Sequence, residues 1–143
     1  MLFTCFKKPK NIDDYFDLRK EALRHNTRAY ELIKSKSELK EVEKELEIET
    51  QLNNKASGKI FKFFNTSKPE NCLNVSCLYA KEAIDLLDDK IIKINKKKID
   101  RLTVEVSEYN SFPSTIEPLE EHIKELGLEY EVMEEKIEIK FNK

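Results

Sequence analysis

Residues 72–87, with the sequence CLNVSCLYAKEAIDLL, constrain the fold more than any other stretch of the chain. Apolar residues alternate over 72–75, which predicts a short buried strand, and then recur at helical spacing, which predicts a helix over about 79–95. A strand joined to a helix by a tight corner is typical of α/β domains, and side chains at the end of such a strand meet the backbone N–H groups of the helix start. Functional groups would therefore be expected at the corner, but Ser76 and Cys77 bring almost no chemistry to it.

The residues after this helix continue the alternation of strands and helices. The pattern predicts a strand at 102–106, a helix at 115–126, and strands at 128–132 and 137–141. Gly127 is placed to end the second helix, and the last two strands are close enough in sequence to form a hairpin. We expect a β-α-β-α-β-β domain over residues 72–143, with its helices packed on a mixed sheet.

The preceding half of the chain has the apolar spacing of helices. We expect a tail at 1–12, helices over 13–65 and a linker at 66–71. A turn signal at 35–37 makes the helical part an antiparallel hairpin or one long broken helix, and residues 49–54 form a polar interruption of its apolar stripe. The predicted fold class is thus α/β, with a helical hairpin followed by a two-layer domain.

Composition narrows the class of protein. Of 143 residues, 39% are hydrophobic and 38% are charged. No apolar run approaches the roughly 20 residues that span a bilayer. The first residues carry their positive charge after the apolar stretch, the reverse of a secretory signal, so we expect a soluble cytoplasmic protein with no membrane partner. Three cysteines without a C-x-x-C pair argue against a disulfide framework and a zinc site, and we expect no metal and no cofactor.

Positive charge is concentrated in two places, although the net charge is −2. One cluster lies on the predicted first helix, and the other at the end of the helix over 79–95. The members are Arg19, Lys20, Arg24 and Arg28 in the first, and Lys90, Lys93, Lys96, Lys97, Lys98 and Arg101 in the second. Such clusters bind phosphates without reading base sequence, but cations on a solvated helix face or at a helix end also occur for structural reasons alone. Both clusters are candidates for RNA binding.

Several segments resemble a known family. They are LYAKEAI at 78–84, LTV at 102–104, IEPL at 116–119, and the strand pair at 128–132 and 137–141. In order and spacing they are similar to the Smr (small MutS-related) domain. Upstream, LRKEA at 18–22 and NNKASGKIF at 53–61 resemble the helical segment that often precedes Smr domains in eukaryotic proteins. The resemblance implies an RNA-related scaffold, because the family is associated with RNA cleavage and translation surveillance.

The resemblance also implies where a nuclease site would lie. Active Smr endonucleases carry L-D-L-H-G at the end of the first strand and a Gly-rich loop, roughly T-G-K-G-x-H-S, after the second. Here the corresponding positions are Asn74, Ser76 and Cys77 at the corner and Ser107, Glu108 and Tyr109 in the loop. The proton-handling acid and imidazole are both replaced, so we expect no catalytic residues. Of the two histidines, we expect His122 on an exposed face and His25 in a hydrogen bond between helices.

Three hypotheses for function follow. The leading one is a catalytically inactive Smr-like protein that binds RNA, in the ribosome or another structured RNA, and acts as an inhibitory or dormancy-type factor. The second is an adaptor that binds a protein partner through the helical hairpin without binding RNA. The third is a residual RNA endonuclease that uses Tyr109 or Arg101.

Overall fold

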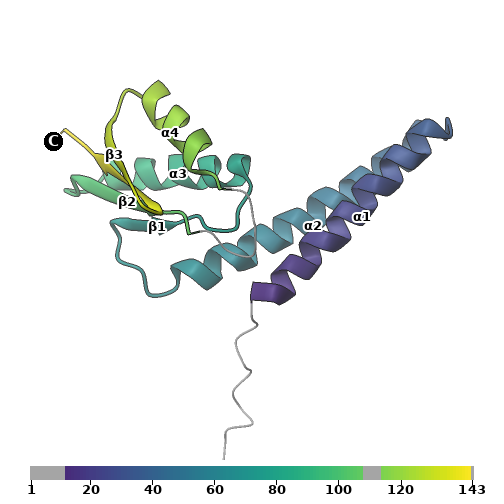
Figure 1. Ribbon diagram of the computed structural model, residues 1–143, viewed down its shortest axis with the longest axis horizontal. Coiled ribbons are helices and arrows are strands. Elements are labelled where there is room, and N and C mark those ends of the chain that lie inside the picture. Colours follow the sequence, from purple (N-terminus) through teal and green to yellow (C-terminus); the bar gives the residue numbers. More distant parts are fainter. Residues whose placement is uncertain (1–11, 108–113, 143) are drawn as a thin grey trace, which may run out of the picture. The chain divides into compact units, whose positions relative to one another are not determined.

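The computed structural model describes residues 12–107 and 114–142. Its elements are α1 (Ile12–Lys34), α2 (Leu39–Asn65), β1 (Cys72–Asn74), α3 (Ala80–Asn95), β2 (Arg101–Glu105), α4 (Ile116–Glu125), β3 (Glu129–Met133) and β4 (Lys136–Lys140), shown in Figure 1. Contacts divide the chain into two compact units, the first ending at Ile60 and the second beginning at Phe61. In the described ranges, no helix has both the length and the apolarity that crossing a bilayer requires.

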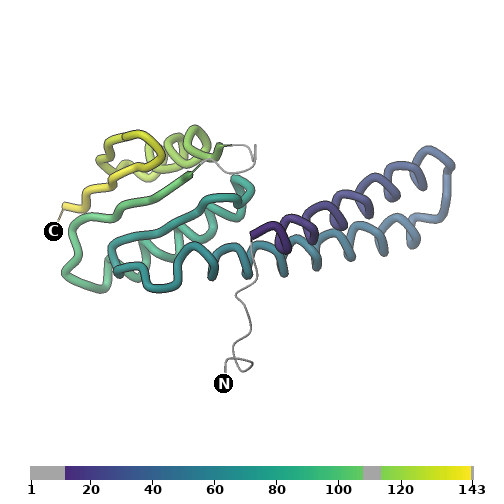
Figure 2. The backbone as a smooth tube through the Cα atoms, turned by 60° about the horizontal axis from the view of Figure 1, so that its bottom comes forward, coloured from purple at the N-terminus to yellow at the C-terminus, as the bar shows by residue number. Residues whose placement is uncertain are grey.

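The first unit is a pair of antiparallel helices. α1 and α2 run side by side in both views (Figure 1, Figure 2). In the turn between them Lys36 has a left-handed φ of 57°, and the N–H of Ser37 donates a hydrogen bond to the carbonyl of Leu32 at 3.0 Å. Of the two predicted arrangements, the hairpin is therefore confirmed, with its turn at the expected place.

Polar side chains join the two helices along much of their length. The hydrogen-bonded pairs are Arg19 with Asn53, Asn26 with Glu49, and His25 with Glu45. Small side chains allow close approach between these pairs, since Ala22, Ala29 and Ala56 are at most 1% exposed. The polar residues at 49–54 do not interrupt α2, which is continuous through them, and two of them supply contacts to α1.

The second unit contains a four-stranded mixed sheet with the strand order β1-β2-β4-β3. β1 is parallel to β2, and β4 is antiparallel to both β2 and β3. The predicted β-α-β-α-β-β order is confirmed. Two crossovers, through α3 and α4, advance in the same direction across the sheet. Because such crossovers are right-handed, both helices lie on the same face of the sheet (Figure 1).

The register of the strands separates an apolar face from a polar one. Leu102 pairs with Ile139 and Val104 with Ile137, and all four residues are fully buried. The helices cover this face with their own buried residues, which are Ala83, Leu87, Ile91 and Ile94 in α3 and Leu119 and Ile123 in α4. Alternate residues of the strands point to the opposite face and are largely charged or polar. The core of this unit therefore lies between the sheet and its two helices.

Local contacts fix the ends of these two helices. At the start of α3, Oε1 of Glu82 accepts a hydrogen bond from the backbone N–H of Tyr79 at 2.9 Å. After α4, Gly127 has a left-handed φ of 72°, and its N–H donates to the carbonyl of Lys124 at 2.9 Å. The prediction that Gly127 ends this helix is confirmed.

Candidate functional site

The corner after β1 lies beside the end of β2, because these neighbouring strands are parallel and their carboxyl ends meet at one edge of the sheet. At this corner Oδ1 of Asn74 accepts a hydrogen bond from the backbone N–H of Ser76 at 2.9 Å. Oγ of Ser76 in turn accepts one from the backbone N–H of Ser107 at 2.8 Å, on the segment that follows β2. The Ser76 hydroxyl thus joins the corner after β1 to the segment after β2, and the Asn74 side chain closes the turn within the corner.

Both side chains are withdrawn from solvent. Asn74 is 6% exposed and Ser76 is 1% exposed. The backbone of Asn74 is also engaged by Asn65, the last residue of α2: Oδ1 of Asn65 accepts from the N–H of Asn74, and Nδ2 donates to its carbonyl, each at 2.7 Å. The amide of Asn65 therefore pairs with the outer edge of β1 as a neighbouring strand would. The polar groups of Asn74 and Ser76 are therefore engaged in hydrogen bonds within the protein.

The backbone of the corner has a conformation that favours glycine. Cys77, which the Smr resemblance aligns with a glycine, has a φ of 63° and is 4% exposed. This left-handed region is unfavourable for residues with a Cβ atom. A cysteine therefore occupies a backbone conformation that glycine would adopt without strain.

The two histidines make contacts between helices. His25 hydrogen bonds with the carboxylate of Glu45 on α2, which lowers the pKa of Glu45 below its ordinary value of 4.5. The expected interhelical hydrogen bond of His25 is confirmed. In the second unit, Nε2 of His122 on α4 lies 2.6 Å from Oδ1 of Asp88 on α3, and the His122 side chain is 21% exposed. The prediction of an exposed His122 is therefore wrong, because this contact draws the ring towards α3.

Of the two residues named for a residual nuclease, Tyr109 and Arg101, the structure describes Arg101. Glu108 and Tyr109 lie outside the described residues. Arg101 is exposed and begins β2, whereas Ser107 follows the other end of that strand. Because a strand rises about 3.3 Å per residue, roughly 13 Å separate the two ends of β2. Arg101 therefore lies at the opposite end of the strand from the corner.

The basic cluster at the end of α3, called the α3 basic cluster below, consists of Lys90, Lys93, Lys96, Lys97, Lys98 and Arg101. Lys90 is half-buried and the other five residues are exposed. Nζ of Lys97 forms an ion pair with the carboxylate of Glu70, and this hydrogen bond, with the nearby charge of Lys90, lowers the pKa of Glu70. Over residues 12–107 and 114–142, the amino groups of Lys90, Lys93, Lys96 and Lys98 form no ion pair. These four cations are available to an anion in solution.

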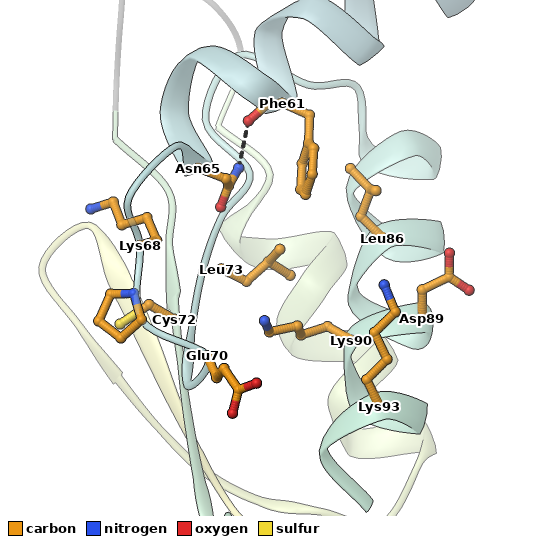
Figure 3. A pocket seen from close by; sticks show the side chains of 11 residues that line it. Phe61, Asn65, Lys68, Glu70, Cys72, Leu73, Leu86, Asp89, Lys90 and Lys93 are labelled. Carbon is orange, nitrogen blue, oxygen red and sulfur yellow. Dashed lines mark hydrogen bonds between the residues drawn. The ribbon is translucent and has the colours of Figure 1, made fainter. Parts of the chain in front are cut away.

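A groove of about 320 Å³ opens beside the α3 basic cluster (Figure 3). Its walls come from the end of α2, the segment at 68–70, β1 and α3. Phe61, Leu73 and Leu86 supply apolar surface, and Lys90 and Lys93 bring two members of the cluster into the lining. Neither Asn74 nor Ser76 lines it. Sequence reasoning missed this groove because its walls come from four segments that share no motif.

The basic residues of α1 are divided by the structure. Lys20, Arg24 and Arg28 are exposed. Arg19 is 6% exposed, and its Nη1 donates to Oδ1 of Asn53 at 2.9 Å inside the hairpin. The prediction that Arg19 lies on an exposed basic face is wrong, because its guanidinium is used to join α1 to α2.

Comparison with known proteins supports the assigned fold. The solution structure of the B3BP Smr domain matches with a TM-score of 0.52 and 17% sequence identity, over 63% of this chain and 96% of that domain. No family model matches the sequence, and no curated protein is significantly similar to it. The chain therefore contains a domain with the Smr fold, as the sequence motifs implied.

Proposed function

We propose that this protein binds RNA through the α3 basic cluster and does not cleave it. The observation that carries the proposal is the concentration of six cations at the end of α3 and the start of β2, five of them exposed. Contacts of this kind hold phosphates, so they give affinity without base specificity. RNA is the nucleic acid we propose because the Smr resemblance points to a family associated with RNA processing.

The proposed lack of cleavage rests on the corner. A general acid–base mechanism needs a side chain that can reach a proton of the substrate. Asn74 and Ser76 are buried and hydrogen-bonded within the fold, and neither has a carboxylate or an imidazole. We infer that the corner now has a structural role.

Structured RNA, and the ribosome in particular, is the target we propose, with an inhibitory or dormancy-type role. This step rests on analogy with the translation-related context of the family. It is open to a direct test, because ribosomes can be sedimented with the bound protein at increasing salt concentration. Binding through phosphates is expected to weaken steeply as salt rises.

A charge-reversal series makes this experiment specific. We expect the triple variant Lys93→Glu, Lys96→Glu, Lys98→Glu to lose ribosome co-sedimentation. The matched control reverses the same charge at three exposed lysines of α2, which are Lys40, Lys55 and Lys62. Equal losses in the two variants would show only a general effect of charge, and absence of co-sedimentation at low salt would overturn the proposal.

The proposal that the protein does not cleave RNA has its own test. RNA cleavage by the natural protein that disappears in Tyr109→Phe or Arg101→Ala would overturn it.

A second candidate function is favoured by the outer face of α1. Leu23 is 64% exposed and Tyr30 is 61% exposed, and their spacing of two helical turns places them on one stripe. Lys20 and Arg24 line a shallow hollow with Leu23. Exposed apolar side chains bordered by cations are suited to an acidic amphipathic helix of a protein partner.

This adaptor function predicts a different pattern of loss. Leu23→Asp combined with Tyr30→Asp would abolish binding to a protein partner in nuclease-treated extract, whereas Thr27→Asp, which adds charge to the same hollow, would weaken it less. The α3 triple variant would retain this binding. Loss of all partners on nuclease treatment would reject the adaptor function.

A further inference from the structure

The groove beside the α3 basic cluster has two chemically distinct ends. At one end the ring of Phe61 and the side chain of Leu86 lie near each other, with the buried Leu73 on the wall between α2 and α3 (Figure 3). At the other end Lys90 and Lys93 line it from α3. An aromatic and aliphatic wall next to cations fits a ligand that has a flat apolar ring and an anionic group.

The charges in the groove leave its two α3 lysines available. Nζ of Lys68 donates to Oε1 of Glu105 at 2.8 Å, and the carboxylate of Glu70 is bound by Lys97, which lies outside the lining. Lys90 and Lys93 have no ion pair in the described ranges, and Asp89 is the remaining acid of the lining. The available charge at this end is therefore net positive.

We propose that the groove binds one nucleotide of an RNA strand, with its base against Phe61 and Leu86 and a phosphate at Lys90 and Lys93. This inference rests on the proposed RNA binding and adds a site that holds a base. The volume of about 320 Å³ lies in the range of small-ligand pockets. Stacking of unpaired bases on aromatic side chains is the usual way in which proteins hold single-stranded RNA, and every base offers a face for it.

Cys72 provides a direct probe of occupancy, because its partly exposed side chain lines the groove. The experiment measures the rate at which N-ethylmaleimide modifies Cys72 in the full chain, with peptide mapping by mass spectrometry to separate this cysteine from the others. A single-stranded RNA oligonucleotide at saturating concentration is expected to slow the reaction at least fivefold. Inorganic phosphate and a free mononucleotide, each at the same concentration as the oligonucleotide, form the comparison arms.

Each arm supports or overturns a defined part of the inference. Protection by RNA with little effect of phosphate or mononucleotide supports a nucleotide held as part of a strand. Protection by the free mononucleotide at equal concentration would overturn the RNA source and leave a small-molecule site. Protection by phosphate alone would overturn the base contact. If RNA binds through the α3 basic cluster and the Cys72 rate does not change, the groove is empty in the complex and this inference fails while the proposed function stands.

A matched pair of aromatic variants gives a second measurement. Phe61→Ala removes the ring that lines the groove, and Phe63→Ala removes an exposed ring of the same helix that does not line it. We expect Phe61→Ala to weaken binding of the oligonucleotide about tenfold, the size of one stacked base, and Phe63→Ala to leave it unchanged. Equal effects of the two substitutions would overturn the base contact. The alkylation experiment needs no substitution in the groove, so it decides the question if Phe61→Ala does not fold.

Discussion

Oγ of Ser76 accepts a hydrogen bond from the backbone N–H of Ser107 at 2.8 Å, across the adjacent carboxyl ends of β1 and β2. This contact links the corner after β1 to the segment after β2, and Ser76 is 1% exposed. The buried Ser76 hydroxyl is therefore bound to the backbone of the segment that extends the neighbouring strand. Its contribution to stability can be measured.

Ser76→Ala is expected to lower the free energy of unfolding by about 1 kcal/mol, because it removes the acceptor of a part-buried N–H group. Urea unfolding monitored by circular dichroism measures the change. Ser114→Ala is the control, since Ser114 is exposed and water can replace its contact with the N–H of Ile116. An unfolding midpoint unchanged by Ser76→Ala would show that the hydrogen bond makes no net contribution to the free energy of unfolding.

The left-handed backbone at Cys77 predicts an unusual order of stability between two substitutions. Cys77→Gly should be more stable than Cys77→Ala by about 1 kcal/mol, because alanine at a φ of 63° has the Cβ strain that glycine lacks. Chemical denaturation of both variants measures the difference. At a position with a negative, helical φ, alanine should instead be more stable than glycine.

Two glycines serve as controls for this prediction. Gly58 lies in the middle of α2, and no atom beyond the backbone of its own helix comes within 4 Å of the position that a Cβ would occupy. Gly58→Ala should therefore stabilise the chain by roughly 0.5–1 kcal/mol. Gly127 has a φ of 72°, so Gly127→Ala should destabilise it. If Cys77→Ala proves more stable than Cys77→Gly while both glycine controls behave as expected, the left-handed conformation of Cys77 is incorrect.

The order of helices and strands could be predicted because it depends on local periodicity. The alternation of apolar residues around Val104 and Ile139 places a strand face in the core, and helical spacing with Gly127 at its end defines α4. These signals lie within each segment. The register and the strand order, by contrast, are set by packing between segments.

The contacts of individual polar residues could not be predicted in the same way. A charged residue on a helix is exposed by default, and nothing near Arg19 in the sequence shows that Asn53 lies opposite its guanidinium. The pairing of the Asn65 amide with the backbone of Asn74 also depends on where the end of α2 lies beside β1. The groove lined by Phe61 was missed for the same physical reason.

The contact between His25 and Glu45 predicts a pH dependence of hairpin stability. The hydrogen bond with His25 lowers the pKa of Glu45 below its ordinary value of 4.5. A carboxyl group whose pKa is lower in the folded state stabilises that state above its unfolded pKa, and this contribution is lost as the pH falls through the folded pKa. Glu45→Gln should therefore destabilise the hairpin at pH 7. The difference in free energy of unfolding from the natural protein should disappear once the pH falls below the folded-state pKa of Glu45.

Urea unfolding of the two proteins at neutral pH and at several acidic pH values measures this difference. Glu43→Gln, at an exposed position on the same helix, is the control and should change stability little at either end of the range. A difference for Glu45→Gln that stays constant down to the lowest pH would contradict the role of its ionised form.

The ion pair between Glu70 and Lys97 predicts a substitution that strengthens RNA binding. Glu70 neutralises one cation of the α3 basic cluster, and Glu70→Gln would remove this negative charge from beside Lys97. We expect a higher affinity for RNA at low salt and a steeper salt dependence, by about one additional phosphate contact. Fluorescence anisotropy with a labelled oligonucleotide over a series of salt concentrations measures both quantities.

Glu121→Gln, which removes the same charge from an exposed position on α4, separates this local effect from the change in net charge. If the two variants gain affinity equally, or if Glu70→Gln gains none, Lys97 is not part of the RNA contact.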